Sequence, residues 1–341
     1  MKDRSNCPVH DLGKGLTVVT GGAGLIGSAV VWGLNQKGFQ NIILVDEENP
    51  SPAKHKNLKN LSFQRQLSPK LFRQLVLSKS QDLGDIHTII HLGACSSTTE
   101  TDEDFLNDNN LCYTKDLCEF SLENNIRFVY ASSAATYGDG VHGMDDQDPD
   151  IKKLQPLNLY GWSKHKFDLL SQERSWDHGI SGLKYFNVFG PNEEHKGHMR
   201  SVVSKAYQQI SETGHMSLFK SHRPEYKNGE QMRDFLYVKD AVEMTLWIAA
   251  HNQANGLFNL GSGKARTWLD LGKSIFKALG KDPNIKFSEM PEILREKYQY
   301  FTEANIEKLR SAGYTASLFS LEQGVEDYVQ LYLEKGNRLG A

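Results

Sequence analysis

This chain of 341 residues has few cysteines, no excess charge of either sign and no proline-rich linker. Its four cysteines form no C-x-x-C motif and have no histidine at metal-ligand spacing: Cys7, Cys95, Cys112 and Cys118. The length excludes a disulfide-stapled miniprotein, and we expect no metal site and a reducing, cytoplasmic setting. With 39 Lys+Arg against 42 Asp+Glu, the net charge of −3 provides no broad basic field for nucleic acid or an anionic membrane. Any anion must therefore be held at a local site.

Long hydrophobic runs are also scarce, and only Leu16–Leu34 is uncharged over a length that could span a bilayer. Five of its residues are glycines, including the adjacent pair Gly21 and Gly22, which favours a strand, a loop and a helix over one membrane-spanning helix. The preceding segment, Met1–Gly15, has no apolar core region, so we expect no signal peptide there. We therefore expect no membrane partner.

Short β-branched runs alternate with segments of helical periodicity in the first half of the chain. The predicted strands are Leu16–Thr20, Asn41–Asp46, Thr88–Leu92, Arg127–Ser132 and Leu183–Tyr185. The predicted helices between them are Gly24–Lys37, Pro69–Lys79 and Glu103–Asn124. This alternation predicts an α/β fold with a doubly wound, Rossmann-type parallel sheet.

Beyond Phe186 the spacing loosens, which indicates a smaller C-terminal α/β lobe. Further helices are predicted near Lys239–His251, Thr267–Leu279 and Leu321–Lys335. We expect an N-terminal extension over residues 1–15 and a dinucleotide-binding domain over 16–186, with later contributions from about 234–262. Residues 187–341 would form mainly the substrate-binding lobe.

The segment T-G-G-A-G-L-I-G, Thr20–Gly27, follows the first predicted strand and opens a helix. Gly21 permits a tight turn, Gly24 lets backbone N–H groups approach a pyrophosphate, and Gly27 allows close packing of helix and strand. The helix N-terminus then offers unpaired donors and a positive dipole to phosphates. In this context the motif predicts a dinucleotide site rather than an ordinary flexible turn.

Asp46 ends the second predicted strand, where a carboxylate accepts hydrogen bonds from an adenosine ribose. Alone this residue favours NAD. Lys54, Lys56 and Lys59 follow closely, and a lysine near the ribose could neutralise the 2′-phosphate of NADP. Charge alone leaves both cofactors open.

Tyr160 and Lys164 stand at i and i+4, on one face of a helix. We expect the ammonium to lower the pKa of the phenol toward the range that an alcohol-oxidising base needs. Ser133 ends a predicted strand and would place a hydroxyl at the carboxyl edge of the sheet. The alternatives are a simple surface pair and a serine that caps a turn.

These motifs together resemble those of the extended short-chain dehydrogenases/reductases, the class of nucleotide-sugar epimerases and dehydratases. The resemblance rests on the glycine loop, the Ser133 strand, Y-G-W-S-K from Tyr160, Tyr185–Pro191, Arg233–Asp240 and Phe258–Gly263. Within the class, other segments are similar to those of the ADP-L-glycero-D-manno-heptose 6-epimerases: Gly93–Glu100, Asp108–Asn110, Ala131–Gly138, His195–Gly197 and Tyr298–Ala304.

The resemblance implies epimerisation at C6″ of an ADP-heptose, by transient oxidation to an aldehyde and re-reduction with bound NADP, to supply heptose for the lipopolysaccharide core. It implies Tyr160 and Lys196 as acid/base groups on opposite faces of the reacting carbon. Lys164 would orient the nicotinamide ribose and tune Tyr160, and Ser133 would hydrogen-bond the reacting oxygen. The family further suggests a homo-oligomer, pentameric in known members.

Other roles are carried over by the same resemblance. Besides the three loop glycines, the implied cofactor contacts are Leu25, Ile26, Asp46, Glu47, Lys54, Leu92, Gly93, Ala94, Cys95, Ser96, Asn109, Lys164 and Val188. The implied contacts with the ADP-sugar are Asn187, Phe219, Lys220, Ser221, His222, Arg233 and Tyr298. Guanidinium binds phosphate oxygens in a fork, so Arg233 suits a diphosphate. The plainer alternatives are a surface lysine at Lys196 and a salt bridge between Arg233 and Asp234.

The chain also departs from the family pattern. His198 stands where the family has a small serine, Lys205 replaces a histidine, and Lys220–Met232 is longer than usual. Glu47 adds a carboxylate that would repel a 2′-phosphate, so NAD is the alternative to NADP.

Three rival functions differ in what they need. A 4,6-dehydratase needs an Asp-Glu pair where this chain has Ala134 and Ala135, which excludes it. A UDP-sugar 4-epimerase needs no second base and is the main enzymatic alternative. A non-catalytic NADP-sensing regulator would be expected to lose the Tyr160 and Lys164 pair.

Overall fold

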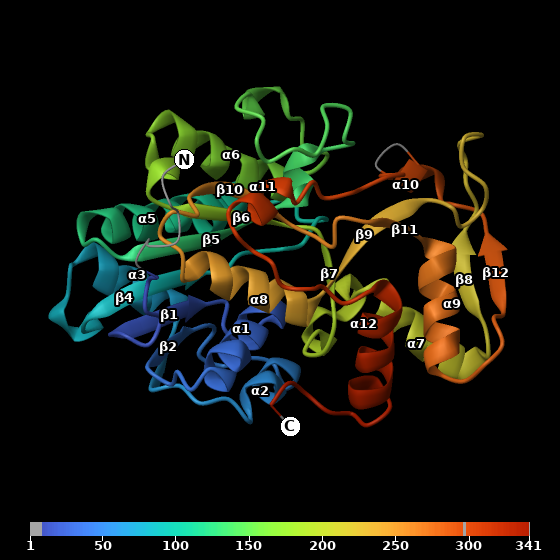
Figure 1. Cartoon of the computed structure of the whole chain (residues 1–341), viewed down its shortest axis with the longest axis horizontal. Coiled ribbons are helices and arrows are strands. Elements are labelled where there is room, and N and C mark those ends of the chain that lie inside the picture. Colours follow the sequence, from blue (N-terminus) through green and yellow to red (C-terminus); the bar gives the residue numbers. More distant parts are fainter. Residues whose placement is uncertain (1–8, 296–297, 341) are drawn as a thin grey trace.

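The computed structural model describes residues 9–295 and 298–340, which form a large sheet-based lobe and a smaller lobe beside it (Figure 1). The large lobe contains a parallel sheet of seven strands in the order β10-β6-β5-β4-β1-β2-β3. Its strands are β1 (Leu16–Thr20), β2 (Ile42–Val45), β3 (Arg65–Leu67), β4 (Ile86–His91), β5 (Arg127–Ser133), β6 (Ser181–Tyr185) and β10 (Gly256–Leu260). The predicted α/β, doubly wound fold is confirmed.

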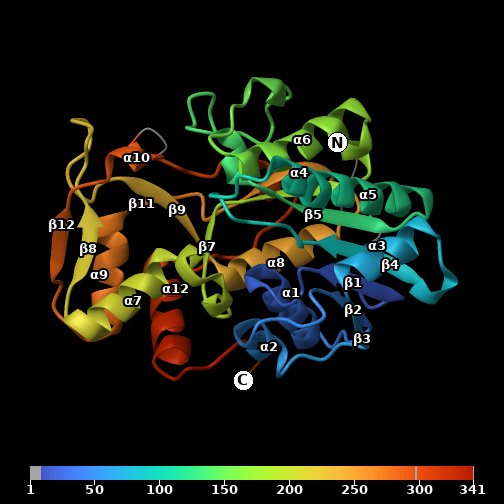
Figure 2. The same ribbon diagram turned by 180° about the vertical axis from the view of Figure 1, so that it is seen from behind.

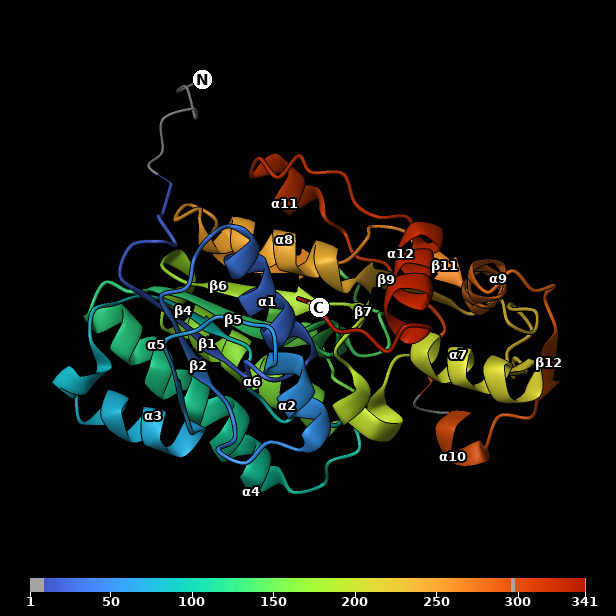
Figure 3. The same cartoon turned by 90° about the horizontal axis from the view of Figure 1, so that it is seen from below.

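Helices cover both faces of this sheet, as Figure 3 shows. One face carries α1 (Leu25–Gln36) and α8 (Val238–Ala249), and the other carries α3 (Pro69–Leu77), α5 (Tyr113–Glu123) and α6 (Leu159–Glu173). The two helices of the first face approach closely because Gly33 has no side chain: a Cβ there would lie 2.4 Å from Val242 Cγ1. The buried cores on the two faces include Leu34 and Phe167, respectively.

The segment Leu16–Leu34 forms β1, a turn and most of α1, as predicted. Within the described residues, no helix has the length and apolar character that crossing a membrane requires. At β1 the strand order reverses, because β2 lies on one side of it and β4 on the other. Open α/β sheets bind ligands at this switch point, beyond the carboxyl ends of the strands.

The smaller lobe is assembled from the later part of the chain and lies at the carboxyl edge of the large sheet (Figures 1 and 2). Its strands are β7 (Asn187–Phe189), β8 (Met216–Phe219), β9 (Met232–Tyr237), β11 (Ala265–Thr267) and β12 (Ile285–Ser288). They pair as a β11-β9-β7 sheet and a parallel β12-β8 ribbon. The helices of both lobes that have not yet been named are α2 (Pro52–Leu58), α4 (Glu103–Leu106), α7 (Val202–Thr213), α9 (Trp268–Ala278), α10 (Glu292–Arg295), α11 (Glu307–Ser311) and α12 (Leu321–Tyr328).

Two of the predicted helices are interrupted by wider turns. The segment Glu103–Asn124 contains a π-helical stretch, Asn107–Cys112, between α4 and α5. The C-terminal helix likewise passes from α12 into a π-helical stretch at Val329–Leu333. Such stretches often occur at functional sites, and the first of them carries Asn109 and Asn110.

Candidate active site

One cavity of about 450 Å³ at the switch point brings together all four predicted catalytic residues, Ser133, Tyr160, Lys164 and Lys196. Twelve of the predicted cofactor-binding residues besides Lys164 line it too: Gly21, Gly24, Leu25, Ile26, Gly27, Asp46, Lys54, Leu92, Gly93, Ala94, Ser96 and Val188. Seven further residues on its wall were given no site role in the sequence analysis, although all but Met199 lie in segments that carry the resemblance: Ser97, Ala131, Ser132, Tyr185, Phe186, His195 and Met199.

The glycine loop has the shape of a phosphate cradle. Gly21 has φ of +65°, and a Cβ on Gly27 would lie 2.0 Å from the carbonyl oxygen of Gly21, so neither position accommodates a side chain without strain. No side chain caps α1 at Gly24, and Leu25 and Ile26 in its first turn line the cavity. The residues present therefore fit the pyrophosphate of a dinucleotide at a helix N-terminus.

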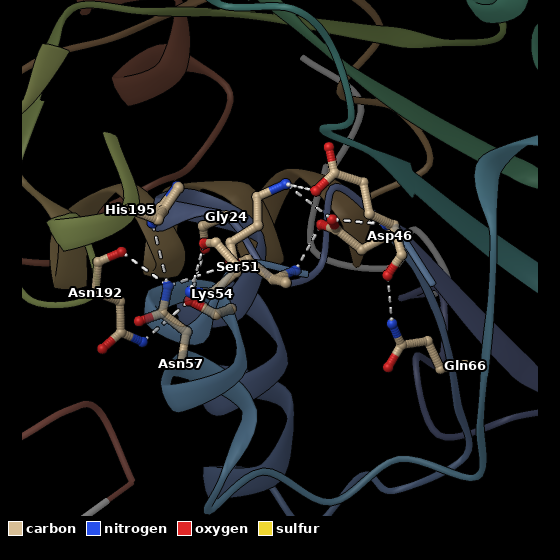
Figure 4. Close-up of polar contacts among 11 residues, drawn as sticks. Gly24, Asp46, Ser51, Lys54, Asn57, Gln66, Asn192 and His195 are labelled. Carbon is tan, nitrogen blue, oxygen red and sulfur yellow. Dashed lines mark hydrogen bonds and ion pairs between the residues drawn. The ribbon is translucent and has the colours of Figure 1, made fainter. Parts of the chain in front are cut away.

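The acidic end of β2 lies beside a lysine of α2 (Figure 4). Asp46 accepts hydrogen bonds from the N–H of Ala23 at 2.8 Å and from Lys54 Nζ at 3.0 Å, and Lys54 also pairs with Glu47 Oε2 at 3.2 Å. Burial lowers the pKa of Lys54, but the two carboxylates outweigh it and hold that pKa above its ordinary value. Asp46, Glu47 and Lys54 thus come together, although the exposed Glu47 side chain does not line the cavity.

Tyr160 lies in the first turn of α6, which Asn158 caps by accepting a hydrogen bond from Gly161 N at 2.8 Å. Burial raises the pKa of the phenol, and the Ser133 hydroxyl opposes that rise. The expectation that Lys164 lowers this pKa is therefore wrong, because burial outweighs any effect of the ammonium. Burial also lowers the pKa of Lys164 to about 8, although the Asp168 carboxylate opposes it.

Ser133 caps a turn and also lines the cavity. Its Oγ accepts a hydrogen bond from Ala135 N at 3.1 Å, so the serine caps the turn after β5. A hydroxyl that accepts here still has a proton to donate. Since Ser133 also lines the cavity, that proton is available to an oxygen of a bound molecule.

A buried network fixes α6 to the sheet beneath the site, and the sequence did not reveal it. Asp168 on α6 accepts hydrogen bonds from Tyr130 Oη at 2.9 Å and Ser132 Oγ at 2.7 Å, both on β5. Lys184 on β6 pairs with the same carboxylate at 3.1 Å. The network therefore fixes the helix that carries Tyr160 against the strand that ends at Ser133.

Lys196 lies on a helical turn, Glu194–Met199, that follows β7 and is kinked at Gly197. Its side chain is half-buried and lines the same cavity as Tyr160. Burial lowers the pKa of this lysine, and Glu193 opposes the shift. Lys196 is therefore not the fully solvated surface lysine of the plainer alternative.

Besides Glu47, two predicted cofactor residues do not line the cavity, at least as far as the described residues define it: Cys95 and Asn109. Both residues are hydrogen-bonded to Asn110, which lies on the π-helical stretch. Asn110 exchanges hydrogen bonds with the N–H and C=O of Cys95 at 2.9 and 3.0 Å and donates to Ser163 Oγ at 2.9 Å. Asn109 donates to Asn110 Oδ1 at 3.0 Å. Asn110 thus joins the segment after β4 to α6.

A second cavity, of about 620 Å³, lies in the smaller lobe and contains the predicted substrate residues Phe219 and Tyr298. Lys205 and Trp268 also line it, and the indole N–H of Trp268 donates to Tyr298 Oη at 2.9 Å. These aromatic side chains provide surfaces on which a planar ring can stack.

Arg233 is buried beside this second cavity, with its guanidinium 5.3 Å from the ring centre of Tyr298. It donates to the carbonyl oxygens of Met232 and Gln299. The salt bridge to Asp234 that the sequence left open is not formed. That carboxylate instead accepts backbone N–H bonds, from Ser262, Gly263 and Ala304.

Besides Arg233, four predicted substrate residues line neither of these two cavities, as far as the described residues define them: Asn187, Lys220, Ser221 and His222. Asn187 donates to the carbonyl oxygen of Asp234 at 3.1 Å. Lys220 pairs with Glu289 at 2.6 Å, and Ser221 and His222 lie in the following loop.

Comparisons with known proteins agree with this geometry. Residues 17–261 match the model of the NAD dependent epimerase/dehydratase family. An ADP-L-glycero-D-manno-heptose-6-epimerase of Nitratidesulfovibrio vulgaris is 50% identical over 316 residues, which cover 93% of this chain and 97% of the relative. A protein of the same name from Fusobacterium nucleatum is 46% identical over 333 residues, with 94% and 98% covered.

A solved structure of a protein with the same name is also similar to this chain. The Helicobacter pylori ADP-L-glycero-D-manno-heptose-6-epimerase has a TM-score of 0.76 at 27% identity, with 93% of this chain and 96% of that chain covered. The family model spans the glycine loop, Tyr160 and Lys196, the same residues that form the cavity. This chain therefore belongs to the NAD dependent epimerase/dehydratase family.

Proposed function

We propose that this protein is an isomerase that inverts C6″ of ADP-D-glycero-D-manno-heptose to give ADP-L-glycero-D-manno-heptose, with NADP as its bound cofactor. The observation that carries the proposal is that two separate acid/base groups, Tyr160 and Lys196, line one cavity next to the glycine loop. Inversion by oxidation and re-reduction needs one such group on each face of the carbon. The printed names of the relatives support the same substrate.

The chemistry at C6″ divides into two matched transfers. A bound nicotinamide dinucleotide supplies the hydride acceptor and, on the return, the hydride donor. One of the two side chains removes the proton of the C6″ hydroxyl as the carbon loses hydride. Because C6″ is bonded to both C5″ and C7″, the intermediate is a ketone and not the aldehyde that the resemblance implied. After the carbonyl group rotates about the C5″–C6″ bond, the other side chain protonates its oxygen as hydride returns to the opposite face. Ser133, beside Tyr160, donates a hydrogen bond to this oxygen while the oxygen lies on the Tyr160 side.

The environments of the two groups shift their pKa values in opposite directions. Burial raises the pKa of Tyr160, which favours the protonated phenol, and lowers the pKa of Lys196, which favours the neutral amine. Burial therefore shifts both groups toward their neutral forms, the phenol and the amine.

The second cavity suits the nucleotide part of the substrate. Phe219, Tyr298 and Trp268 offer aromatic faces to an adenine ring. Arg233 donates to two carbonyl oxygens, and a guanidinium has five N–H donors, so others remain for a diphosphate.

Incubation with each of two nucleotide sugars, followed by NMR, tests the proposed function. We expect ADP-D-glycero-D-manno-heptose to be inverted at C6″ and UDP-glucose to be left unchanged. Inversion of UDP-glucose at C4″ without change in the heptose would instead establish the UDP-sugar 4-epimerase alternative. Turnover of neither sugar by the cofactor-loaded protein would overturn the proposal.

The choice of NADP depends on Lys54. This ammonium, 3.0 Å from Asp46 and 3.2 Å from Glu47, balances part of the negative charge that would otherwise repel a 2′-phosphate. We expect Lys54→Gln to weaken NADP binding about tenfold or more, the loss of one charge-assisted hydrogen bond, and to change NAD binding little. Calorimetry with both cofactors measures this.

The control is Lys56→Gln, an exposed lysine on the same helix, which should bind both cofactors normally. Mass spectrometry of the nucleotide released from the denatured protein gives a second readout. Release of NAD⁺ alone would contradict the choice of NADP.

A further inference from the structure

Helix α2 lies between the glycine loop and the segment that leads to Lys196, and one of its side chains contacts both (Figure 4). Asn57 is only 1% exposed, and its Nδ2 donates to the carbonyl oxygen of Ala23 at 3.0 Å and to that of Asn192 at 3.0 Å. The ring Nδ1 of His195 lies 3.4 Å from the same nitrogen. A single amide therefore joins the backbones of two loops that are remote in sequence.

The two partners fix the orientation of this amide. Both backbone groups are carbonyl acceptors, so only the NH₂ side of Asn57 can face them. The amide oxygen is left buried without a hydrogen-bond partner among the described residues. Burying this oxygen without a partner costs free energy. The two hydrogen bonds that the nitrogen donates offset that cost.

Beyond Asn192 the chain is held firmly up to the lysine. The Asn192 side chain donates to Ser28 Oγ on α1 at 3.0 Å. Glu193 accepts hydrogen bonds from Ser201 Oγ at 2.6 Å and Tyr328 Oη at 2.9 Å. The N–H of Lys196 then donates to the carbonyl oxygen of Glu193 at 3.0 Å. A displacement at Asn192 would thus be transmitted to Lys196 over only four residues.

We propose that Asn57 is a positioning residue that holds Lys196 at a fixed place relative to the glycine loop. The inference rests on the proposed function, because the chemical role of Lys196 does. Asn57 lies outside the wall of the catalytic cavity and acts through the lysine. Lys54, one turn earlier on α2, holds Asp46 at the cofactor end, so the same short helix connects both parts of the site.

Replacing Asn57 by leucine keeps the approximate size of the side chain and removes both hydrogen bonds. We expect kcat to fall about tenfold to a hundredfold, the effect of a small misplacement of one reacting group, with little change in KM. The loss should be confined to oxidation of one epimer, the one whose oxidation Lys196→Met also slows. The absorbance of the reduced cofactor, measured with each epimer separately, shows which of the two oxidations is slowed. A merely structural role for Asn57 would slow both oxidations alike.

The matched control is Asn35→Leu. Asn35 also donates to two carbonyl oxygens, those of Phe39 at 3.0 Å and Ser62 at 2.9 Å, but it joins segments away from Lys196. Asn57→Ser, which retains one donor, should give an intermediate loss and serves if the leucine variant does not fold.

Amide hydrogen exchange gives a readout that does not depend on activity. Residues 192–199 should exchange faster in Asn57→Leu than in the wild type, and at the wild-type rate in Asn35→Leu. Unchanged exchange there, or equal slowing of both epimers, would overturn the positioning role. If the wild-type protein fails to epimerise the heptose, the proposed function falls, whereas the exchange result still decides whether Asn57 holds the Lys196 segment.

Discussion

Replacing Tyr160 by phenylalanine is expected to lower kcat for heptose inversion by about a thousandfold, the range typical for loss of a general acid or base. The substitution removes one hydroxyl and leaves the ring, so the first turn of α6 and its Asn158 cap should remain. Steady-state kinetics, together with a thermal unfolding curve and a measurement of bound cofactor, checks this prediction.

The control for that experiment is Tyr207→Phe, in which the same hydroxyl is removed from α7 of the smaller lobe. We expect this variant to retain wild-type kcat. Near-normal turnover by Tyr160→Phe would contradict the assignment of the phenol as an acid/base group.

Replacing Lys196 by methionine should reduce inversion by a comparable factor for a different reason. Methionine keeps most of the length and apolar bulk of the side chain but cannot transfer a proton. Proton transfer would therefore remain possible on only one face of the carbon. We expect one epimer still to be oxidised at close to the normal rate and the other to be oxidised about a thousandfold more slowly. Tyr160→Phe should give the opposite preference.

The exposed residue Lys152 provides a control, and Lys152→Met is expected to have no effect. A Lys196→Met variant that inverts the heptose at the normal rate would contradict the two-base account. Equal losses with both epimers would point instead to a general disturbance of the site.

Much of the cofactor half could be predicted because its signals are local. β1 spans the expected residues, Leu16–Thr20, since a β-branched run directly precedes a glycine turn. Gly21 and Gly27 were identified correctly because a left-handed φ and a close backbone approach each require glycine. The i, i+4 spacing of Tyr160 and Lys164 likewise placed both residues on one helix.

Other parts of the site depend on contacts between distant segments. Asn57 and Asn192 are 135 residues apart, and periodicity carries no information about such a pair. The buried pair of Asp168 and Lys184 was missed because a charged residue in a helix or strand is usually exposed. Resemblance, and not residue chemistry, first identified Lys196.

The pKa of Tyr160 shows a further limit of sequence reasoning. Spacing gives the distance along a helix from Tyr160 to Lys164, but it does not give the burial of either group. Burial decides both shifts, upward for the phenol and downward for the ammonium. The direction of the first shift therefore could not be obtained without the fold.

The most direct test of the account uses ADP-D-glycero-D-manno-heptose that carries deuterium at C6″, incubated with the protein in ordinary water. Because the carbon-bound hydrogen moves as hydride to the bound cofactor and back, it should not exchange with solvent. We expect NMR and mass spectrometry to show a product inverted at C6″ that retains its deuterium. Inversion with loss of the deuterium to water would contradict the account, since the carbon would then have been deprotonated rather than oxidised.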